Sequence, residues 1–377
     1  ALDVTTLFTA AALFLGVVVG NAALFGDTLF ATVTVPQSLT SIGLTQTTAE
    51  RMFVTNVAHY LKVPSLLQTP SVTSSSAQNL PMAMAKPFNL QDVVYAIQTS
   101  VRSDSVNVSA SIVNAEKGGG LLMYLLINNP PDPPTATVLH QPDGDPEALI
   151  AQAARRTMEI AAPFRVANSD MAAALSGDKT GMARAKATAI GGLAEPWDPR
   201  ISGVTEVVML HNLLAIIAMI NGDKADAQNH CAVGLNTQGA EPAAYGLIWL
   251  NQAFFAIAER NTHEANRLYD KGSAAVRHVR SQGLQMRVLS LGGIIAWISG
   301  DLPEAERRFR SAIATGAGDS EPHRYLALLL TQQGNLAEAK QQQEIAALTR
   351  FADSRYPSLA HTYLSLDPAK PGFSHDF

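Results

Sequence analysis

The sequence predicts a mainly α-helical protein in three parts: an N-terminal transmembrane helix, a small α+β domain with the order αβββα, and a C-terminal α-solenoid of helical hairpins. Three observations lead to this prediction. The first is a long uncharged stretch near the start of the chain. The second is an alternation of apolar and polar residues over 106–112, and the third is a set of alanines and glycines that recur every 34 to 40 residues.

Composition limits the classes of protein to consider. A length of 377 residues allows two or three domains. The formal net charge of −5 disfavours a nucleic-acid-binding protein, which usually carries a basic stripe. A single cysteine, Cys231, excludes an internal disulfide and a cysteine-rich zinc site, and it does not indicate a compartment.

The membrane prediction rests on the 23 uncharged residues from Val4 to Gly26. As a helix they span about 34 Å, enough for the hydrocarbon core of a bilayer, which is about 30 Å thick. The apolar core of a cleaved signal peptide is shorter, at about 7–15 residues. We expect an uncleaved anchor within residues 1–31, with a buried soluble helix or a retained signal peptide as alternatives. No basic residue follows before Arg51, so the positive-inside rule gives little guidance on orientation. We interpret the anchor as a single pass through a bacterial inner membrane, with the bulk of the chain in the periplasm.

Residues 28–37 are predicted to be extended, because they are rich in β-branched residues and the run ends at Pro36. Within residues 32–87, one helix is predicted over 44–63, followed by a linker rich in Ser, Thr and Pro over 64–87.

The αβββα domain is predicted over 88–163. A helix over 89–102 carries one apolar stripe, and residues 106–112 alternate with a period of two, as in a strand with one wet face. A glycine triplet then leads into a strand over 121–127, which is apolar on both faces and is therefore expected to be central. A third strand follows over 135–140.

The closing helix of this domain begins with a standard signal. Asp145 stands at the N-cap, Pro146 at the first helical position and Glu147 in the first turn. The glycine triplet lacks the GxGxxG spacing of a phosphate-binding loop, so it indicates a hairpin turn.

Residues 204–352 contain a fourfold internal repeat. Small residues recur in three columns, a pattern that lets antiparallel helices joined by Gly-Asp or Gly-Asn turns approach closely. Each such hairpin leaves an apolar face that the next hairpin covers, which predicts a solenoid. Gly293 is expected to face Ala305 across the turn. The columns contain Ala215, Ala253, Gly293 and Ala327; Ala227, Ala265, Ala305 and Ala339; and Gly234, Gly272, Ala312 and Ala346.

The segment GDLPEAERRFRSAI, residues 300–313, resembles the central motif of tetratricopeptide repeats, and Asn251 matches the first-helix asparagine common in that family. About four repeats are covered, of which the first two depart from the pattern, because Arg260 replaces a turn glycine and Cys231 an aromatic residue. Residues 164–203 are either a linker or a degenerate repeat, and residues 353–377 are expected to form a capping helix and a polar tail. The resemblance implies a concave surface that binds partner proteins.

No catalytic motif is present: the sequence has no HExxH, no GxSxG and no GxxxxGK[ST]. We therefore predict no enzyme activity, no catalytic residue, no cofactor and no metal. A set of basic residues is the candidate for binding an acidic peptide or lipid headgroups, with a solvated helix face as the alternative. The set comprises Arg277, Arg280, Arg287, Arg307, Arg308 and Arg310.

The sequence thus favours a membrane-anchored, non-catalytic scaffold or accessory subunit of a multi-subunit complex on the periplasmic side. Its expected partners are other membrane or periplasmic proteins and, through Val4 to Gly26, the lipid bilayer; nucleic acid is not expected. The alternative is a periplasmic ligand- or glycan-sensing module built on the αβββα domain. An enzyme of cell-envelope chemistry is a third and weaker hypothesis.

Overall fold

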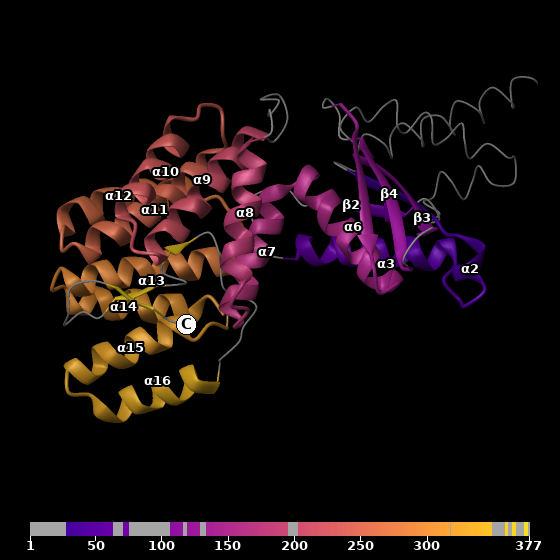
Figure 1. Cartoon of the computed structure of the whole chain (residues 1–377). Coiled ribbons are helices and arrows are strands. Elements are labelled where there is room, and N and C mark those ends of the chain that lie inside the picture. The colour runs from indigo at the N-terminus through magenta and orange to yellow at the C-terminus, as the bar shows by residue number, and fades with distance from the viewer. Residues whose placement is uncertain are drawn as a thin grey trace, which may run out of the picture. The chain divides into compact units, whose positions relative to one another are not determined.

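The computed structural model describes residues 28–62, 71–74, 106–115, 119–128, 133–194, 203–316, 318–348, 359–360, 364–366 and 373–375. These residues form a mainly helical protein with a small mixed sheet, as predicted (Figure 1). They divide into two compact units, one up to residue 162 and the other from residue 163 onward. The predicted anchor from Val4 to Gly26 and the helix predicted over 89–102 lie outside the described residues.

The first unit contains a five-stranded sheet with the order β2-β1-β3-β4-β5. Strand β1 lies parallel to both β2 and β3, whereas β3, β4 and β5 form an antiparallel meander. The strands are β1 (Thr28–Thr34), β2 (Ser71–Ser74), β3 (Val106–Asn114), β4 (Leu121–Asn128) and β5 (Thr135–Gln141).

Two helices, α3 (Gln46–Leu61) and α6 (Pro146–Ala161), pack against this sheet and against each other. A short helix, α2 (Gln37–Thr40), precedes them. The predicted start of α6 is confirmed, since the Asp145 carboxylate accepts a hydrogen bond of 2.9 Å from the backbone N–H of Glu147. The alternation in β3 is confirmed as well: its apolar residues Val108, Ala110 and Ile112 are buried.

The sheet is larger than the three strands predicted over 88–163. Strand β1 overlaps the range given to the anchor, residues 1–31, and β2 lies inside the predicted linker. Leu29, Ala31 and Val33 of β1 are buried on one face, so this strand belongs to the core of the unit. The strand order arises from pairing between distant segments, such as Leu29 with Val106, which leaves no local signal in the sequence.

Strand β4 is central, as predicted, because it pairs with both β3 and β5. Its two faces differ, however. Met123 and Leu125 are buried, whereas Tyr124 is 52% exposed and Leu126 is 46% exposed within the described residues. The apolar residues of this strand are therefore buried on one face only, within the described residues.

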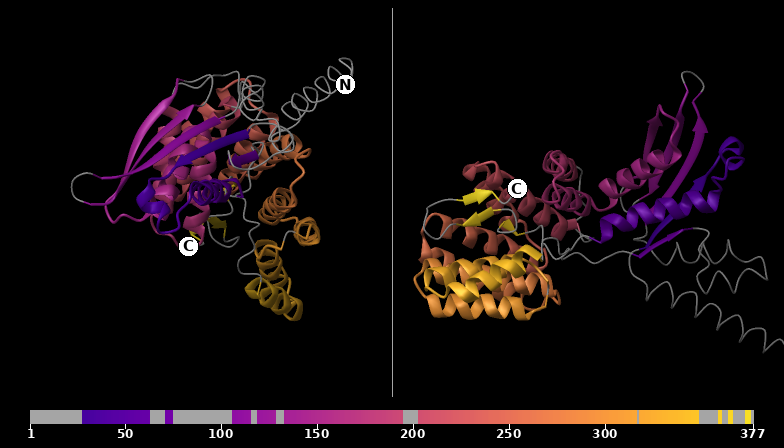
Figure 2. Two further views of the ribbon diagram at one scale, coloured as in Figure 1. Left: turned by 90° about the vertical axis from the view of Figure 1, so that its right-hand side faces the viewer. Right: turned by 90° about the horizontal axis from the view of Figure 1, so that it is seen from below.

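The second unit is built from five helical hairpins whose helices pack in sequence order (Figures 1 and 2). Within each hairpin the two helices contact each other, and the first helices α9, α11, α13 and α15 contact one another in series. The hairpins are α7 (Pro163–Leu175) with α8 (Gly181–Ala194), α9 (Gly203–Ile220) with α10 (Lys224–Asn236), α11 (Pro242–Ala258) with α12 (Thr262–Val276), α13 (Gln282–Ile298) with α14 (Leu302–Ala314), and α15 (Glu321–Gln332) with α16 (Leu336–Leu348).

The four hairpins from α9 to α16 use the same turn. A residue with positive φ ends each first helix, and the next residue, Asp or Asn, accepts a hydrogen bond from the backbone N–H three positions later. Glycine adopts positive φ without steric cost, and three of the turns have glycine there. Arg260, with φ of 62°, stands at the equivalent position of the α11–α12 turn and is the one non-glycine residue with positive φ in the described part of the chain.

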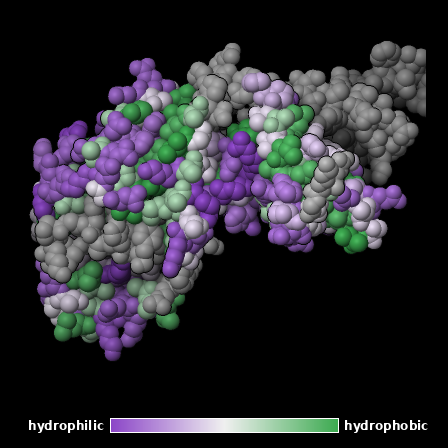
Figure 3. Space-filling model, in the orientation of Figure 1, coloured by the Kyte–Doolittle hydropathy of each residue, from purple (hydrophilic) through white to green (hydrophobic). Residues whose placement is uncertain are grey.

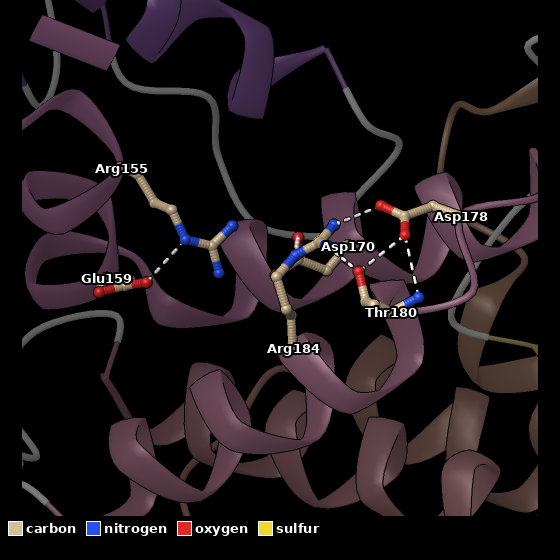
Figure 4. A network of polar contacts seen from close by, with 6 residues as sticks. All are labelled: Arg155, Glu159, Asp170, Asp178, Thr180 and Arg184. Atoms are coloured by element: carbon tan, nitrogen blue, oxygen red, sulfur yellow. Dashed lines mark hydrogen bonds and ion pairs between the residues drawn. The ribbon is translucent and has the colours of Figure 1, made fainter. Parts of the chain in front are cut away.

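The α7–α8 hairpin lies in the range predicted to be a linker or a degenerate repeat, and its helical form favours the second alternative. Its turn contains Gly177, with φ of 99°, and Asp178, whose carboxylate accepts from the backbone N–H of Thr180 at 2.9 Å. Figure 4 shows Arg184 bridging this turn and helix α7, through bonds of 2.8 Å to Asp178 and 3.1 Å to Asp170. These bonds and the one from Thr180 lower the pKa of Asp178 well below its ordinary value. The other pair drawn, Arg155 with Glu159, lies within α6.

The end of the chain differs from the predicted capping helix. Residues Leu364–Leu366 (β6) and Phe373–His375 (β7) pair as antiparallel strands, and in Figures 1 and 2 they lie beside the stack of hairpins rather than on α16. The physical reason is visible afterwards: Leu-Ser-Leu has a period of two, and Pro371-Gly372 in the sequence favours a turn between the strands.

Helix α9 is, within the described residues, long and apolar enough by length and composition to cross a membrane, but 83% of it is buried inside the unit. The core helix of a soluble protein has the same properties.

Candidate peptide-binding site

The first and second helices of the hairpins differ in polarity. Helix α11 contains no charged residue, and α9 contains only Glu206. The second helices carry most of the charge, and hydrophilic residues cover most of the coloured surface of this unit in Figure 3. The first helices therefore supply the core, and a polar side chain buried among them needs a specific partner.

Two such side chains, Asn212 of α9 and Asn251 of α11, are fully buried and joined to each other. The Asn251 Nδ2 donates to Asn212 Oδ1 at 2.7 Å. The Asn251 Oδ1 in turn accepts a hydrogen bond of 2.7 Å from the backbone N–H of Ala360. These two hydrogen bonds orient the Asn251 amide, with its oxygen toward the backbone N–H of Ala360 and its nitrogen toward Asn212.

Ala360 belongs to the C-terminal segment, 109 positions away from Asn251 in the sequence. Leu359 and Ala360 are both fully buried and belong to the same apolar cluster as Leu213 and Phe254. These two residues are therefore held among the first helices in two ways, by a hydrogen bond from the backbone of Ala360 to the Asn251 side chain and by burial of their apolar side chains. We define the C-terminal segment as the described residues 359–360, 364–366 and 373–375.

Six basic residues are predicted by the sequence to bind a partner at the surface. For Arg287 this prediction is wrong. Its side chain is 1% exposed and forms ion pairs with Glu321 through Nη1 and with Asp319 through Nη2. The Asp319 carboxylate also accepts from the backbone N–H of Glu321 at 2.8 Å. Arg287 therefore joins α13 to the start of α15 inside the unit and does not line a surface. A local pattern cannot reveal this, because its partners lie more than 30 positions away.

Three other arginines lie on α14 and are engaged with carboxylates. Glu304 accepts from Arg307 at 2.7 Å and from Arg308 at 2.6 Å, and these bonds lower its pKa to about 2. Arg310 reaches Glu338 of the next hairpin at 2.7 Å. This arrangement favours the alternative interpretation, a solvated helix face.

The remaining two basic residues, Arg277 and Arg280, are exposed at and after the end of α12. The Nε of Arg277 donates to the neighbouring His278 at 2.9 Å.

The small residues of the three repeat columns lie in buried positions, as expected where helices cross closely. All twelve positions are buried except Ala346, which is half-buried. A Cβ built on Gly272 would lie 2.9 Å from the carbonyl oxygen of Gly246, so α11 and α12 approach there closely. A Cβ on Gly293 would lie 2.5 Å from a ring carbon of Phe309, so the nearest neighbour of Gly293 across the hairpin is this ring.

Sequence reasoning missed a histidine pair and a buried acid. His211 of α9 and His230 of α10 face each other with their Nδ1 atoms 3.0 Å apart, and burial lowers the pKa of His211 to about 4. Glu206 accepts from the backbone N–H of Phe164 at 2.9 Å, and burial raises its pKa to about 7. Histidine spacing along one helix could not reveal a pair that belongs to two helices.

Within the described residues, no group of three or more His, Cys, Asp or Glu side chains is arranged to hold a metal ion. Cys231 is buried, and burial raises the pKa of its thiol to about 12, as fits a packing role.

The first unit has a depression of about 530 Å³ between α3 and the start of α6, lined by both polar and apolar residues. It is open to solvent, and its polar lining residues are Arg51, Thr55, Asn56, Asp145 and Glu147. This depression is the feature of the unit that bears on the ligand-sensing alternative.

No family model and no curated protein matches the chain. Among solved structures, the chain is similar to the crystal structure of BtubC (BKLC) from P. vanneervenii, with 16% sequence identity and a TM-score of 0.38. That likeness covers 52% of this chain and 85% of the other. At this level it carries no argument about fold or function.

Proposed function

We propose that this protein is a membrane-anchored, non-catalytic scaffold. In this proposal its C-terminal helical hairpins form an α-solenoid of the tetratricopeptide type and bind partner proteins of a larger complex on the periplasmic side of a bacterial inner membrane. The supporting observation is the buried Asn212–Asn251 pair, which accepts a hydrogen bond of 2.7 Å from the backbone N–H of Ala360, in a segment of the same chain beyond the last hairpin.

The chemistry of this pair suits the recognition of a peptide. An amide that accepts from a backbone N–H reads the main chain and not a particular side chain. In an apolar environment such a bond gains strength, because no water competes for it. The surrounding first helices provide the apolar surface that a partner side chain can cover, which is the usual composition of the core of an interface.

Association can be tested by isolating the tagged full-length protein from native membranes in mild detergent and comparing three forms: wild type, Asn251→Ala and Asn266→Ala. Asn266 lies exposed on α12, so its variant controls for the loss of an asparagine as such. The proposal expects one stoichiometric set of partners with wild type and Asn266→Ala, and its depletion with Asn251→Ala at unchanged helicity. Equal recovery with all three forms would contradict binding at this site.

The anchor and its orientation need a separate experiment. Alkaline phosphatase fused after residue 367 is expected to be active, and a fluorescent reporter that folds only in the cytoplasm is expected to be dark. The reverse pattern would overturn the periplasmic assignment.

The second candidate function, a periplasmic ligand- or glycan-sensing module, is favoured by the depression beside α3 and α6, whose lining includes several polar side chains. Arg51 there is exposed and is the cation available to an anionic sugar or a carboxylate. Saturable binding from a panel of such compounds, abolished by Arg51→Met and retained by Arg156→Met on α6, would favour this alternative.

A further inference from the structure

We propose that the C-terminal segment acts, through Leu359 and Ala360, as an internal ligand of the peptide-binding site and has to leave before a partner protein binds. This inference rests on the proposed function and adds a mode of regulation to it. The observation that carries it is the contact itself: the residues that fill the site belong to the same chain and lie beyond the last hairpin.

The contact has the properties of a ligand and not of a structural element. Its hydrogen bond comes from the backbone of Ala360, which any peptide can reproduce. Its buried side chains are those of Leu359 and Ala360, a small apolar pair that many sequences contain. The site therefore has little means to distinguish this segment from a partner of similar chemistry.

The described part of the segment contains one small pair of strands. Strands β6 and β7 are three residues each and pair only with each other among the described strands. An isolated two-stranded hairpin is marginally stable in water. Within the described residues, burial of Leu359 and Ala360 and the hydrogen bond to Asn251 join the segment to the first helices, and the proposal requires these contacts to break while the hairpins stay folded.

The C-terminal segment competes with a partner for the site, and it has the advantage of being part of the same chain. Residues 349–358 connect it to the end of α16, and a short linker gives an effective concentration of about the millimolar range. A free peptide of the same intrinsic affinity then binds only weakly. Once the segment is out, the Asn251 carbonyl loses a hydrogen bond inside an apolar environment, which favours its replacement by a partner.

The test uses a fluorescent synthetic peptide with the sequence of residues 353–377 as the probe. Its affinity is measured by anisotropy for the detergent-solubilised full-length chain and for the same chain ending at residue 352. The truncated chain is expected to bind the probe at least about tenfold more tightly. Asn251→Ala in the truncated chain is expected to abolish this binding, and Asn266→Ala is expected to retain it.

A second pair of variants keeps the test decisive if the truncated chain does not fold. Ala360→Pro removes the N–H that reaches Asn251, whereas Ala360→Gly keeps it. In the full-length chain, Ala360→Pro is expected to increase probe binding and to speed amide hydrogen exchange in residues 359–366, and Ala360→Gly is expected to do neither.

The inference is overturned if the probe binds intact and truncated chains with equal affinity, or if Ala360→Pro changes neither probe binding nor exchange. Failure of the proposed function is a different result. In that case the probe behaves as expected, but no partner is recovered from native membranes by either the full-length or the truncated chain.

Discussion

In the helical unit, each apolar face is covered by the neighbouring hairpin along the chain, so contacts are local and repeat at a regular interval. In the sheet unit, the strands that pair are far apart: β1 lies between β2 and β3, and Leu29 pairs with Val106. The helical unit thus repeats one kind of contact between neighbouring hairpins, whereas the sheet unit requires contacts between segments that are far apart in the sequence. Damage should therefore stay near its origin in the first case and spread through the unit in the second.

The largest loss of stability is expected at the buried ion pairs of Arg287, which join α13 to residues at the start of α15. Arg287→Met removes the cation from a buried ion-pair network and leaves Asp319 and Glu321 without their arginine partner. Breaking such a network costs about 3–5 kcal/mol. Hydrogen exchange is expected to show the loss of protection in α15 and α16 and its retention in α9 to α12. Uniform loss across the unit would contradict local damage, and Arg277→Met, at an exposed position, is the control.

The matching test in the sheet unit is Ile112→Ala on β3. Ile112 is 2% exposed, and removing its buried methyl groups costs about 2–5 kcal/mol. Because the sheet is a single cooperative structure, protection is expected to fall together in β3, β4, α3 and α6. Loss confined to β3 would erase the proposed difference between the two units. Val138→Ala, at a position that is 56% exposed on β5, should change little.

A pH-dependent effect is expected at Glu206. Its folded-state pKa is raised to about 7, above its ordinary value of 4.5. The contribution of neutral Glu206 to the free energy of unfolding is therefore fully present below pH 4.5 and is lost as the pH rises through 7. Glu206→Gln stays neutral and keeps an acceptor for the N–H of Phe164. It should match wild type at pH 4.5 and exceed it at pH 8 by about 3 kcal/mol.

The midpoint of thermal unfolding at the two pH values checks this, with the exposed Glu344→Gln as the control. The pKa of His211, lowered to about 4, acts in the opposite direction, because its contribution is present above pH 6.5 and is lost as pH falls to 4. In the Glu206→Gln variant, stability should therefore rise from pH 4 to 6.5. If the unfolding midpoints of Glu206→Gln and wild type differ by the same amount at both pH values, Glu206 is not the titrating group.

A smaller effect is expected at the helix crossing of the third repeat. Adding a methyl group at Gly293 brings it to 2.5 Å from the Phe309 ring, and overpacking of this kind costs about 1–3 kcal/mol. Gly293→Ala should lower the denaturation midpoint, and Phe309→Leu should partly restore it in the double variant. If Gly293→Ala is neutral, the ring moves aside and the crossing is looser than the structure indicates. Gly191→Ala on α8, where a Cβ meets no atom within 4 Å, is the control.

The smallest effect is a gain. Arg260 occupies the left-handed region at the turn where the other three hairpins of the repeat have glycine, and a non-glycine residue there costs about 1 kcal/mol. Arg260→Gly should raise stability by about this amount in equilibrium denaturation, with the same change at the right-handed Arg324 as a destabilising control. Loss of stability with Arg260→Gly would mean that Arg260 makes a contact worth more than its strain.

Sequence patterns succeeded where structure depends on neighbours along the chain. The period of two in β3, the capping signal at Asp145 and the Gly-Asp turns of the hairpins are each fixed within a few residues, so each could be predicted. Small residues at helix crossings were predicted from spacing alone, although the partner of Gly293 was not. The basic cluster failed in part because a list of arginines does not distinguish exposed cations from Arg287, whose carboxylates lie on another hairpin.

What the sequence determined by itself is the repeating helical hairpin, since apolar periodicity, turn glycines and capping residues specify it locally. The tertiary structure alone decided which distant groups meet: β1 in the middle of the sheet, Arg287 in a buried network, His211 opposite His230, and Ala360 bound to Asn251. The physical reason is that a hydrogen bond or an ion pair between distant segments forms only after the chain has folded. Nothing in the local composition of either segment records the other.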